Sequence, residues 1–337
     1  MSSRTGLKRT DGQRLPLRLA ALCGPSTLAL SVAARHPTPA VRKVLDKVFH
    51  LVSAPHAKDA QSRDLVVDGA DGARLAARLY EPEGVSQDAG LLVFFHGGGF
   101  VLGSLDSHAN TCRFTARQAG CKVLAVGYRK PPEHRFPTAF QDCLAAYRWA
   151  AAHAAELGVD PQRIAVGGDS AGGNLAASVA LHLDEDDVQP CLAWLIYPFV
   201  DADIDRHPSA QLFAAGPLLS RQCALDMLHQ YAPGPREQLD ERMTVIDADA
   251  LDRMPPTYIA TAGMDPLRDQ GERFGERLGA AGVQVQVRRF TDLPHGFDLL
   301  LIDPGCRAAT AETCDALARA LARAGDRGPA DVPQAAA

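Results

Sequence analysis

The sequence predicts an α/β fold in which helices cover both faces of a mostly parallel sheet. From residue 64 onward, short apolar runs alternate with longer stretches of helical periodicity, the pattern typical of such sheets. Eight runs qualify as strands, and a glycine-rich turn directly follows two of them. With 337 residues, 46% of them hydrophobic, the chain can bury the core of one large domain with insertions, or of two small domains.

Before the sheet, the sequence predicts a basic arm and one amphipathic helix. A moderately apolar stretch, 19–34, follows several basic residues and looks a little like a signal sequence, but Gly24-Pro25-Ser26-Thr27 interrupts it. We therefore interpret it as a partly ordered arm. Residues 37–52 are predicted to form a helix with prolines at or before its first turn. Its apolar face at helical spacing consists of Val41, Val44, Leu45, Val48, Phe49 and Val52.

The sheet strands are predicted at 64–68, 75–80, 91–95, 122–127, 163–167, 191–197, 257–262 and 283–290. The first two flank Asp71-Gly72 and are expected to pair as an antiparallel hairpin. Helical periodicity predicts helices at 138–157, 171–183, 268–281 and 305–324.

The interval 199–255 breaks this alternation. It is rich in Pro, Asp and Ala and offers one helical stretch, 220–231, with no convincing strand. An insertion of this size between sheet strands often covers an active site. We therefore divide the chain into an N-terminal arm and cap helix (1–60), a catalytic domain (61–198 and 256–324), a cap insertion (199–255) and a mobile tail (325–337).

Composition restricts the partners and the compartment. The net charge is −5 and no long basic run occurs, so a nucleic-acid partner is not expected. No uninterrupted segment approaches the ~20 apolar residues of a membrane span. The eight cysteines form no CxxC pair, which argues against a zinc ribbon or a thioredoxin-like site. We expect free thiols and a cytoplasmic location, although an even count also suits disulfides in a secreted chain.

The motif Gly168-Asp169-Ser170-Ala171-Gly172 is predicted to be a nucleophile elbow. It follows the strand RIAVG and precedes the helical stretch NLAASVALHL, the context that a G-x-S-x-G turn requires. Glycines on both sides allow the tight turn, and the helix N-terminus favours developing negative charge on Ser170. The alternative is a simple strand–helix turn.

Three glycines follow His96 directly after the strand LLVFF. Glycines at a strand end leave backbone N–H groups free to stabilise an oxyanion. We expect the N–H groups of Gly98, Gly99 and Ala171 to form this hole, with Gly97 as a further member. A flexible turn or a phosphate-binding loop is the alternative, but the sequence contains neither GxGxxG nor GxxxxGK.

Asp265 and His295 each follow a predicted strand, in TAGMDPLRD and LPHGF. The C-terminal ends of parallel strands gather the site of an open α/β sheet. The order Ser170, Asp265, His295 is the order expected when a serine nucleophile, an orienting carboxylate and a histidine base occur on this type of fold. The sequence therefore predicts a catalytic triad and acyl transfer through an acyl-enzyme.

The chain resembles the hormone-sensitive-lipase-like family of α/β-hydrolases, whose bacterial members are carboxylesterases. The resemblance rests on HGGGF (96–100), YRKPPEHRFPTA (128–139), GDSAGGN (168–174), DPLRD (265–269) and HGF (295–297). It implies an eight-stranded α/β-hydrolase sheet, a helical cap built from the N-terminal segment and the insertion, and hydrolysis of short- to medium-chain acyl esters. It also implies no metal or other cofactor, and a homodimer formed through the last strand.

The sequence departs from the family at Lys130 and Pro131, because the usual YRLAPEH reads YRKPPEH here. This loop supports the oxyanion side of the site, so the departure bears on the pocket wall. Glu133 and His134 are interpreted as structural residues of the same loop.

Two other functions are compatible with these motifs. The same triad can cleave amides or carbamates, and the scaffold can serve as a non-catalytic receptor for a small molecule, as in the plant gibberellin receptors. Those receptors lack the catalytic histidine, which is present here as His295. Long-chain lipase activity is less expected, since 199–255 carries many Asp, Arg and Gln residues. Phe199, Phe213 and Tyr231, like Trp194 and Tyr197, are expected either in the core or along the pocket.

Overall fold

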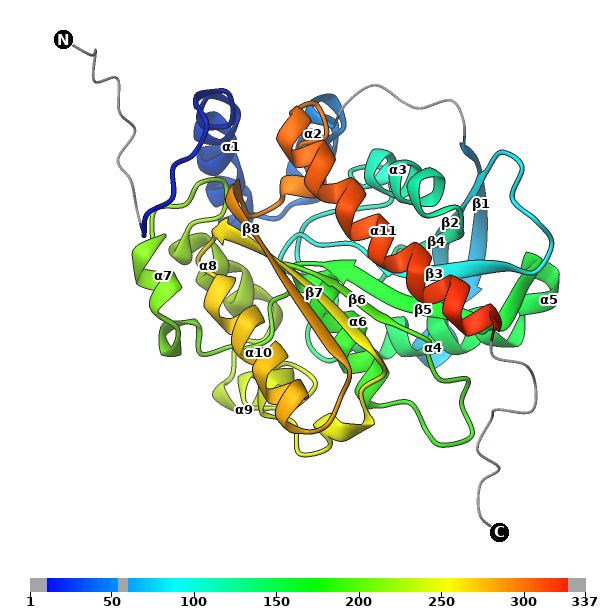
Figure 1. Ribbon diagram of the computed structural model, residues 1–337. Coiled ribbons are helices and arrows are strands. Elements are labelled where there is room, and N and C mark those ends of the chain that lie inside the picture. The colour runs from blue at the N-terminus through cyan, green and yellow to red at the C-terminus, as the bar shows by residue number, and fades with distance from the viewer. Residues whose placement is uncertain (1–10, 54–59, 327–337) are drawn as a thin grey trace.

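The structure is a computed structural model that describes residues 11–53 and 60–326. Its centre is one eight-stranded sheet with the strand order β1-β2-β4-β3-β5-β6-β7-β8 (Figure 1). The strands are β1 Ala60–Asp68, β2 Arg74–Pro82, β3 Ala89–Phe95, β4 Lys122–Val126, β5 Val159–Asp169, β6 Ala193–Ile196, β7 Thr257–Met264 and β8 Val285–Pro294. β1 and β2 form the predicted antiparallel hairpin, β2 pairs antiparallel with β4, and every other pair is parallel.

The central strand β3 is apolar throughout because both faces of the sheet are covered there. All seven residues of β3 are buried. Leu91 and Phe95 belong to one hydrophobic cluster, and Leu92 and Phe94 belong to the other. Successive side chains of a strand point to opposite faces, so a continuous apolar run such as LLVFF identifies a doubly covered strand.

Helices lie on both faces of this sheet. α3 and α11 pack against one face, while α4, α6 and α10 pack against the other (Figure 1). The helices are α1 Leu17–Arg35, α2 Pro39–Val52, α3 Ala109–Ala119, α4 Thr138–Ala152, α5 Ala154–Leu157, α6 Ala171–Leu181, α7 Pro208–Leu212, α8 Arg221–Tyr231, α9 Pro235–Gln238, α10 Arg268–Ala280 and α11 Pro304–Asp326. Short 3-10 helices occur at Ala70–Gly72, Ile204–Arg206, Val245–Asp247, Leu251–Arg253 and Phe297–Leu299.

The N-terminal segment differs from its prediction. Residues 17–35 form one continuous helix with Pro25 inside it, where the sequence predicted an interrupted, partly ordered arm. The helix persists because its inner face is buried, at Leu19, Leu30 and Ala33, and because it packs against α8. By length and composition α1 could cross a membrane, and it is the one such helix among residues 11–53 and 60–326.

The interval 199–255 contains α7, α8, α9 and three 3-10 helices and no strand in the structure, as the sequence predicted. At the other end of the chain, α11 continues to Asp326, so the predicted tail begins two residues too early. The remainder of that tail, 327–337, and the first ten residues of the predicted arm lie outside the described residues.

Candidate active site

Ser170 lies in a sharp turn between the end of β5 and the start of α6. Its backbone has φ 53° and ψ −118°, a conformation that residues other than glycine rarely adopt. The turn packs closely onto the end of β3: a Cβ placed on Gly172 would lie 1.9 Å from the carbonyl oxygen of Phe95, and one on Gly168 would lie 2.3 Å from the same atom. Both flanking glycines of the motif are therefore sterically required.

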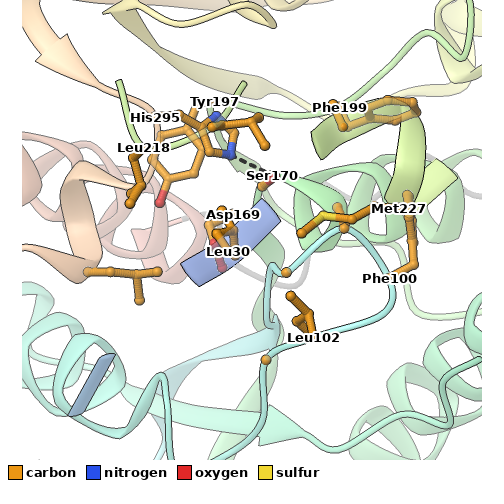
Figure 2. A pocket seen from close by; sticks show the side chains of 18 of the residues that line it. Leu30, Phe100, Leu102, Asp169, Ser170, Tyr197, Phe199, Leu218, Met227 and His295 are labelled. Carbon is orange, nitrogen blue, oxygen red and sulfur yellow. Dashed lines mark hydrogen bonds between the residues drawn. The ribbon is translucent and has the colours of Figure 1, made fainter. Parts of the chain in front are cut away.

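The three predicted triad residues meet at the C-terminal edge of the sheet, although Ser170 and His295 are 125 residues apart in the sequence. His295 Nε2 lies 2.9 Å from Ser170 Oγ (Figure 2), and His295 Nδ1 lies 2.7 Å from Asp265 Oδ2. The other Asp265 oxygen accepts the N–H of Leu267 at 2.9 Å, and the Asp265 side chain is fully buried. The arrangement has the geometry of a nucleophile, a base and an orienting carboxylate.

The glycine loop after β3 lies beside Ser170. Gly98 and Gly99 have φ values of 109° and 59°, which a glycine adopts without strain. Within the described part of the chain, the N–H groups of Gly98, Gly99 and Ala171 donate no hydrogen bond. The Gly97 N–H, by contrast, donates to Asp169 Oδ1 at 2.7 Å. The prediction that Gly97 joins the oxyanion hole is therefore wrong, because its only backbone donor is already used.

A second group of buried acids lies beneath the triad. Asp169 faces His108, whose Nε2 lies 3.3 Å from an Asp169 oxygen. The hydroxyl of Tyr197 donates to Asp298, and the Tyr197 ring lies 4.6 Å from the imidazole of His295. Burial, reinforced by the negative charge of Asp169, raises the pKa of Asp298 well above its ordinary value.

The cavity at Ser170 is small and largely apolar. Its volume is about 70 Å³, compared with the ~10–15 Å³ that a single water requires by the same measure. Ser170, Asp169 and His295 are among the polar residues that line it (Figure 2). The apolar walls include Leu30 of α1, Phe49 of α2 and Met227 of α8. The segment before Ser170 and the segment between Ser170 and Asp265 therefore both contribute to this pocket.

The aromatic residues that the sequence left ambiguous divide between pocket and core. Tyr197 and Phe199 line the cavity. Phe213, Trp194 and Tyr231 are buried without lining it. Leu30, Met227 and Asp298 were not among the predicted site residues, and only the HGFD sequence next to His295 could have drawn attention to Asp298.

Comparison with known proteins identifies the family of the chain. A family profile described as the alpha/beta hydrolase fold matches residues 92–299. The chain is 42% identical to the carboxylic ester hydrolase LipN of Mycobacterium tuberculosis over 270 residues, covering 77% of this chain and 70% of the relative. It is 41% identical to an ethyl acetate hydrolase of Pseudomonas putida, covering 69% of this chain and 74% of the relative.

Solved structures give the same result. A bacterial heroin esterase superimposes with a TM-score of 0.81 at 33% identity, covering 91% of this chain and 98% of that one. An esterase of Pyrobaculum calidifontis superimposes with a TM-score of 0.77 at 33% identity, covering 83% and 92%. The chain belongs to the hormone-sensitive-lipase-like family of α/β-hydrolases. Its relatives are carboxylesterases, and it is a carboxylic ester hydrolase of the bacterial type.

Proposed function

We propose that the protein hydrolyses short- to medium-chain acyl esters through Ser170, His295 and Asp265. The observation that carries the proposal is the continuous contact from Asp265 Oδ2 to His295 Nδ1 and from His295 Nε2 to Ser170 Oγ, at 2.7 and 2.9 Å. With Nδ1–H donating to Asp265, the unprotonated Nε2 is oriented to accept the hydroxyl proton of the serine.

In the first half of the reaction, Ser170 Oγ attacks the ester carbonyl while His295 takes its proton. The N–H groups of Gly98, Gly99 and Ala171 stabilise the resulting oxyanion; in a serine protease of another fold, removing a side-chain donor with this role costs ~2.7–4 kcal/mol of barrier. The alcohol leaves with the proton returned by His295. Water, activated by the same imidazole, then hydrolyses the acyl-enzyme and restores the free serine.

The size of the pocket favours short acyl groups over long ones. A cavity of about 70 Å³ closed by Leu30, Phe49 and Met227 has room for a small acyl group and little more. We propose that α1, α2 and the interval 199–255 act together as the cap over this cavity, since residues from all three contribute to its walls.

The test is hydrolysis of p-nitrophenyl esters from acetate to palmitate by the wild type and by Ser170→Ala. We expect activity that is highest on short chains and is lost in the variant, whose unfolding temperature should remain within a few degrees of the wild type. A variant that keeps most of the activity would refute the assignment of the nucleophile.

An amidase or carbamate hydrolase would use the same triad. Comparing turnover of a phenyl ester with that of the matching anilide separates the two, and we expect the ester to be strongly preferred. If no ester or anilide is hydrolysed but a small molecule binds, the receptor function replaces the enzymatic one.

We further propose a cytoplasmic location and a homodimer. All eight cysteines, each of them within the described residues, are free thiols, which suits a reducing compartment. β8 is the last strand of the sheet and offers an edge for pairing with a second copy. Light scattering coupled to gel filtration tests the dimer; a monomeric mass at micromolar concentration would exclude it.

A further inference from the structure

Lys130, where the sequence departs from its family, reaches the loop that carries the oxyanion-hole glycines. Its Nζ donates a hydrogen bond of 2.7 Å to the carbonyl oxygen of Gly103. The ammonium group also lies 5.7 Å from the centroid of the Tyr128 ring, within the range of a cation–π contact. A leucine at this position could make neither interaction.

Gly103 packs directly behind the loop. A Cβ on Gly103 would lie 2.3 Å from the carbonyl oxygen of Gly97. A Cβ on Gly98 would lie 2.5 Å from the carbonyl carbon of Leu102 and 2.9 Å from the nitrogen of Gly103. The Leu102 N–H also donates to the Gly98 carbonyl at 2.8 Å. With the backbones this close, the position of the Gly103 peptide determines where Gly97 and Gly98 can lie.

Tyr128 makes a second connection to the same loop. Its hydroxyl donates to the carbonyl oxygen of His96 at 2.7 Å, and its ring stacks on the imidazole of His96 with centroids 4.3 Å apart. His96 immediately precedes the three glycines. Lys130 therefore holds the end of the loop at Gly103. It also contacts Tyr128, which holds the beginning of the loop at His96.

We propose that Lys130 is a positioning residue for ester hydrolysis, fixing the oxyanion loop through the carbonyl of Gly103. The proposal rests on the function proposed above, because it concerns the backbone donors of that reaction. Lys130 does not line the cavity at Ser170, so we expect it to act through the placement of the Gly98 and Gly99 N–H groups.

The charge of Lys130 is sensitive to pH in the range where esterases are assayed. Burial, together with the nearby cation of Arg42, lowers the pKa of Lys130 to about 8, and the carboxylates of Asp46 and Glu133 oppose this shift. The facing imidazole of His96 has a pKa well below its ordinary value because it is buried, so it remains neutral as Lys130 titrates. Below pH 8 the ammonium makes a charge-assisted hydrogen bond, and above it a weaker neutral one. We expect kcat to fall as the pH rises through about 8.

The experiment compares kcat and KM for p-nitrophenyl acetate from pH 6 to 10 in the wild type, Lys130→Leu, Lys130→Arg and Lys47→Leu. Lys130→Leu should lower kcat roughly 10-fold at pH 7, since small displacements of catalytic groups have effects of this order or larger, with little change in KM. Lys130→Arg should restore most of kcat and remove the step near pH 8, because arginine remains charged throughout. Lys47, an exposed residue of α2, is the matched control and should behave as the wild type.

Three results would overturn the inference. The first is an unchanged kcat in Lys130→Leu, and the second is a fall in kcat/KM that comes entirely from a higher KM. The third is the same fall in kcat near pH 8 in Lys130→Arg and in the wild type. If Lys130→Leu fails to fold, as judged by circular dichroism, the pH profiles of the wild type and Lys130→Arg decide alone. Failure of the proposed function is distinguishable, because ester turnover would then be absent or independent of Ser170 in every variant.

Discussion

The glycines on either side of Ser170 are packed so closely that neither can carry a methyl side chain. Gly172 is the clearest case, since its Cβ position lies 1.9 Å from a backbone oxygen of β3 and a backbone atom cannot rotate away as a flexible side chain can. The strained φ of Ser170 is maintained by this close packing, which is the usual condition for backbone strain at a functional site.

We expect Gly172→Ala to destabilise the fold by about 3 kcal/mol or more, as overpacking of a rigid contact does, and to abolish ester hydrolysis. Gly279→Ala is the matched control. Gly279 lies within α10 and its Cβ would meet nothing within 4 Å, so the substitution should raise stability by ~0.5–1 kcal/mol. Urea unfolding followed by circular dichroism measures both. Equal stability of the two variants would contradict the steric account of the elbow.

Asp298 makes stability depend on pH in a direction opposite to that of an ion-paired carboxylate. Its folded-state pKa is raised by burial and by Asp169, while the unfolded value is about 3.9. Its contribution to stability is therefore complete below pH ~3.9 and is lost as the pH rises toward the folded-state pKa. The Asp298→Asn variant keeps an oxygen that can accept the hydrogen bond from the Tyr197 hydroxyl, but its side chain cannot ionise.

The unfolding temperature of Asp298→Asn, minus that of the wild type, should accordingly increase from pH 4 upward. Differential scanning calorimetry from pH 4 to 9 measures the difference, with Asp186→Asn, at an exposed position, as the control. A difference that stays constant across this range would mean that Asp298 is ionised throughout.

The meeting of Ser170, Asp265 and His295 could be predicted from the sequence because each of these residues follows a strand in a short local pattern. Gly97 could not, since its donor is occupied by Asp169 and that contact joins segments 72 residues apart. Met227 and Leu30 were missed for a related reason. Nothing in their local sequence indicates a pocket, and only the packing of α1 and α8 around Ser170 brings them there.

At the scale of elements, α1 shows that packing overrides local preference. A proline inside a helix costs ~3 kcal/mol or more, and Pro25 is tolerated while the inner face of α1 packs on α8. Leu30 and Leu28 lie on the same helix but differ fundamentally in environment: Leu30 lines the pocket and is 7% exposed, whereas Leu28 is 70% exposed.

Leu30→Ala should therefore shift the acyl-chain preference toward longer esters, because the removed side chain enlarges the wall of the cavity. The measurement is kcat/KM for p-nitrophenyl acetate, butyrate and hexanoate, and we expect the hexanoate-to-acetate ratio to increase several-fold. Leu28→Ala should leave this ratio unchanged. A shift of equal size in both variants would show that α1 acts only through overall stability.

All eight strands could be predicted, and the signal is clearest for fully buried strands such as β3 and β6, which are continuous apolar runs. α3 could not, because its buried face consists largely of small and polar residues such as Asn110, Thr111 and Thr115. Such residues pack well between a sheet and a second helix, yet they carry no hydrophobic periodicity. The position of α3 is set by the strands and by α11, against which it packs.

For the molecule as a whole, the cysteines are constituents of the core. Seven of the eight are buried, and Cys191 is half-buried. Burial raises the pKa of several of these thiols, including those of Cys112 and Cys143, which suppresses the reactive thiolate.

We expect a thiol reagent such as DTNB to modify no more than Cys191 in the folded protein and all eight cysteines in guanidinium chloride. Dithiothreitol should change neither the unfolding temperature nor ester hydrolysis. Loss of stability on reduction would reveal a disulfide and would argue for an oxidising compartment.

The contact between α1 and the segment before α8 has a consequence for synthesis on the ribosome. The Leu218 N–H donates to Thr27 Oγ1 at 3.0 Å across 191 residues. At about 5–20 residues per second, this partner emerges roughly 10–40 s after α1. During that interval the face of α1 that packs on α8 lacks its partner, so the nascent chain presents an apolar segment to chaperones and targeting factors long before the enzyme exists.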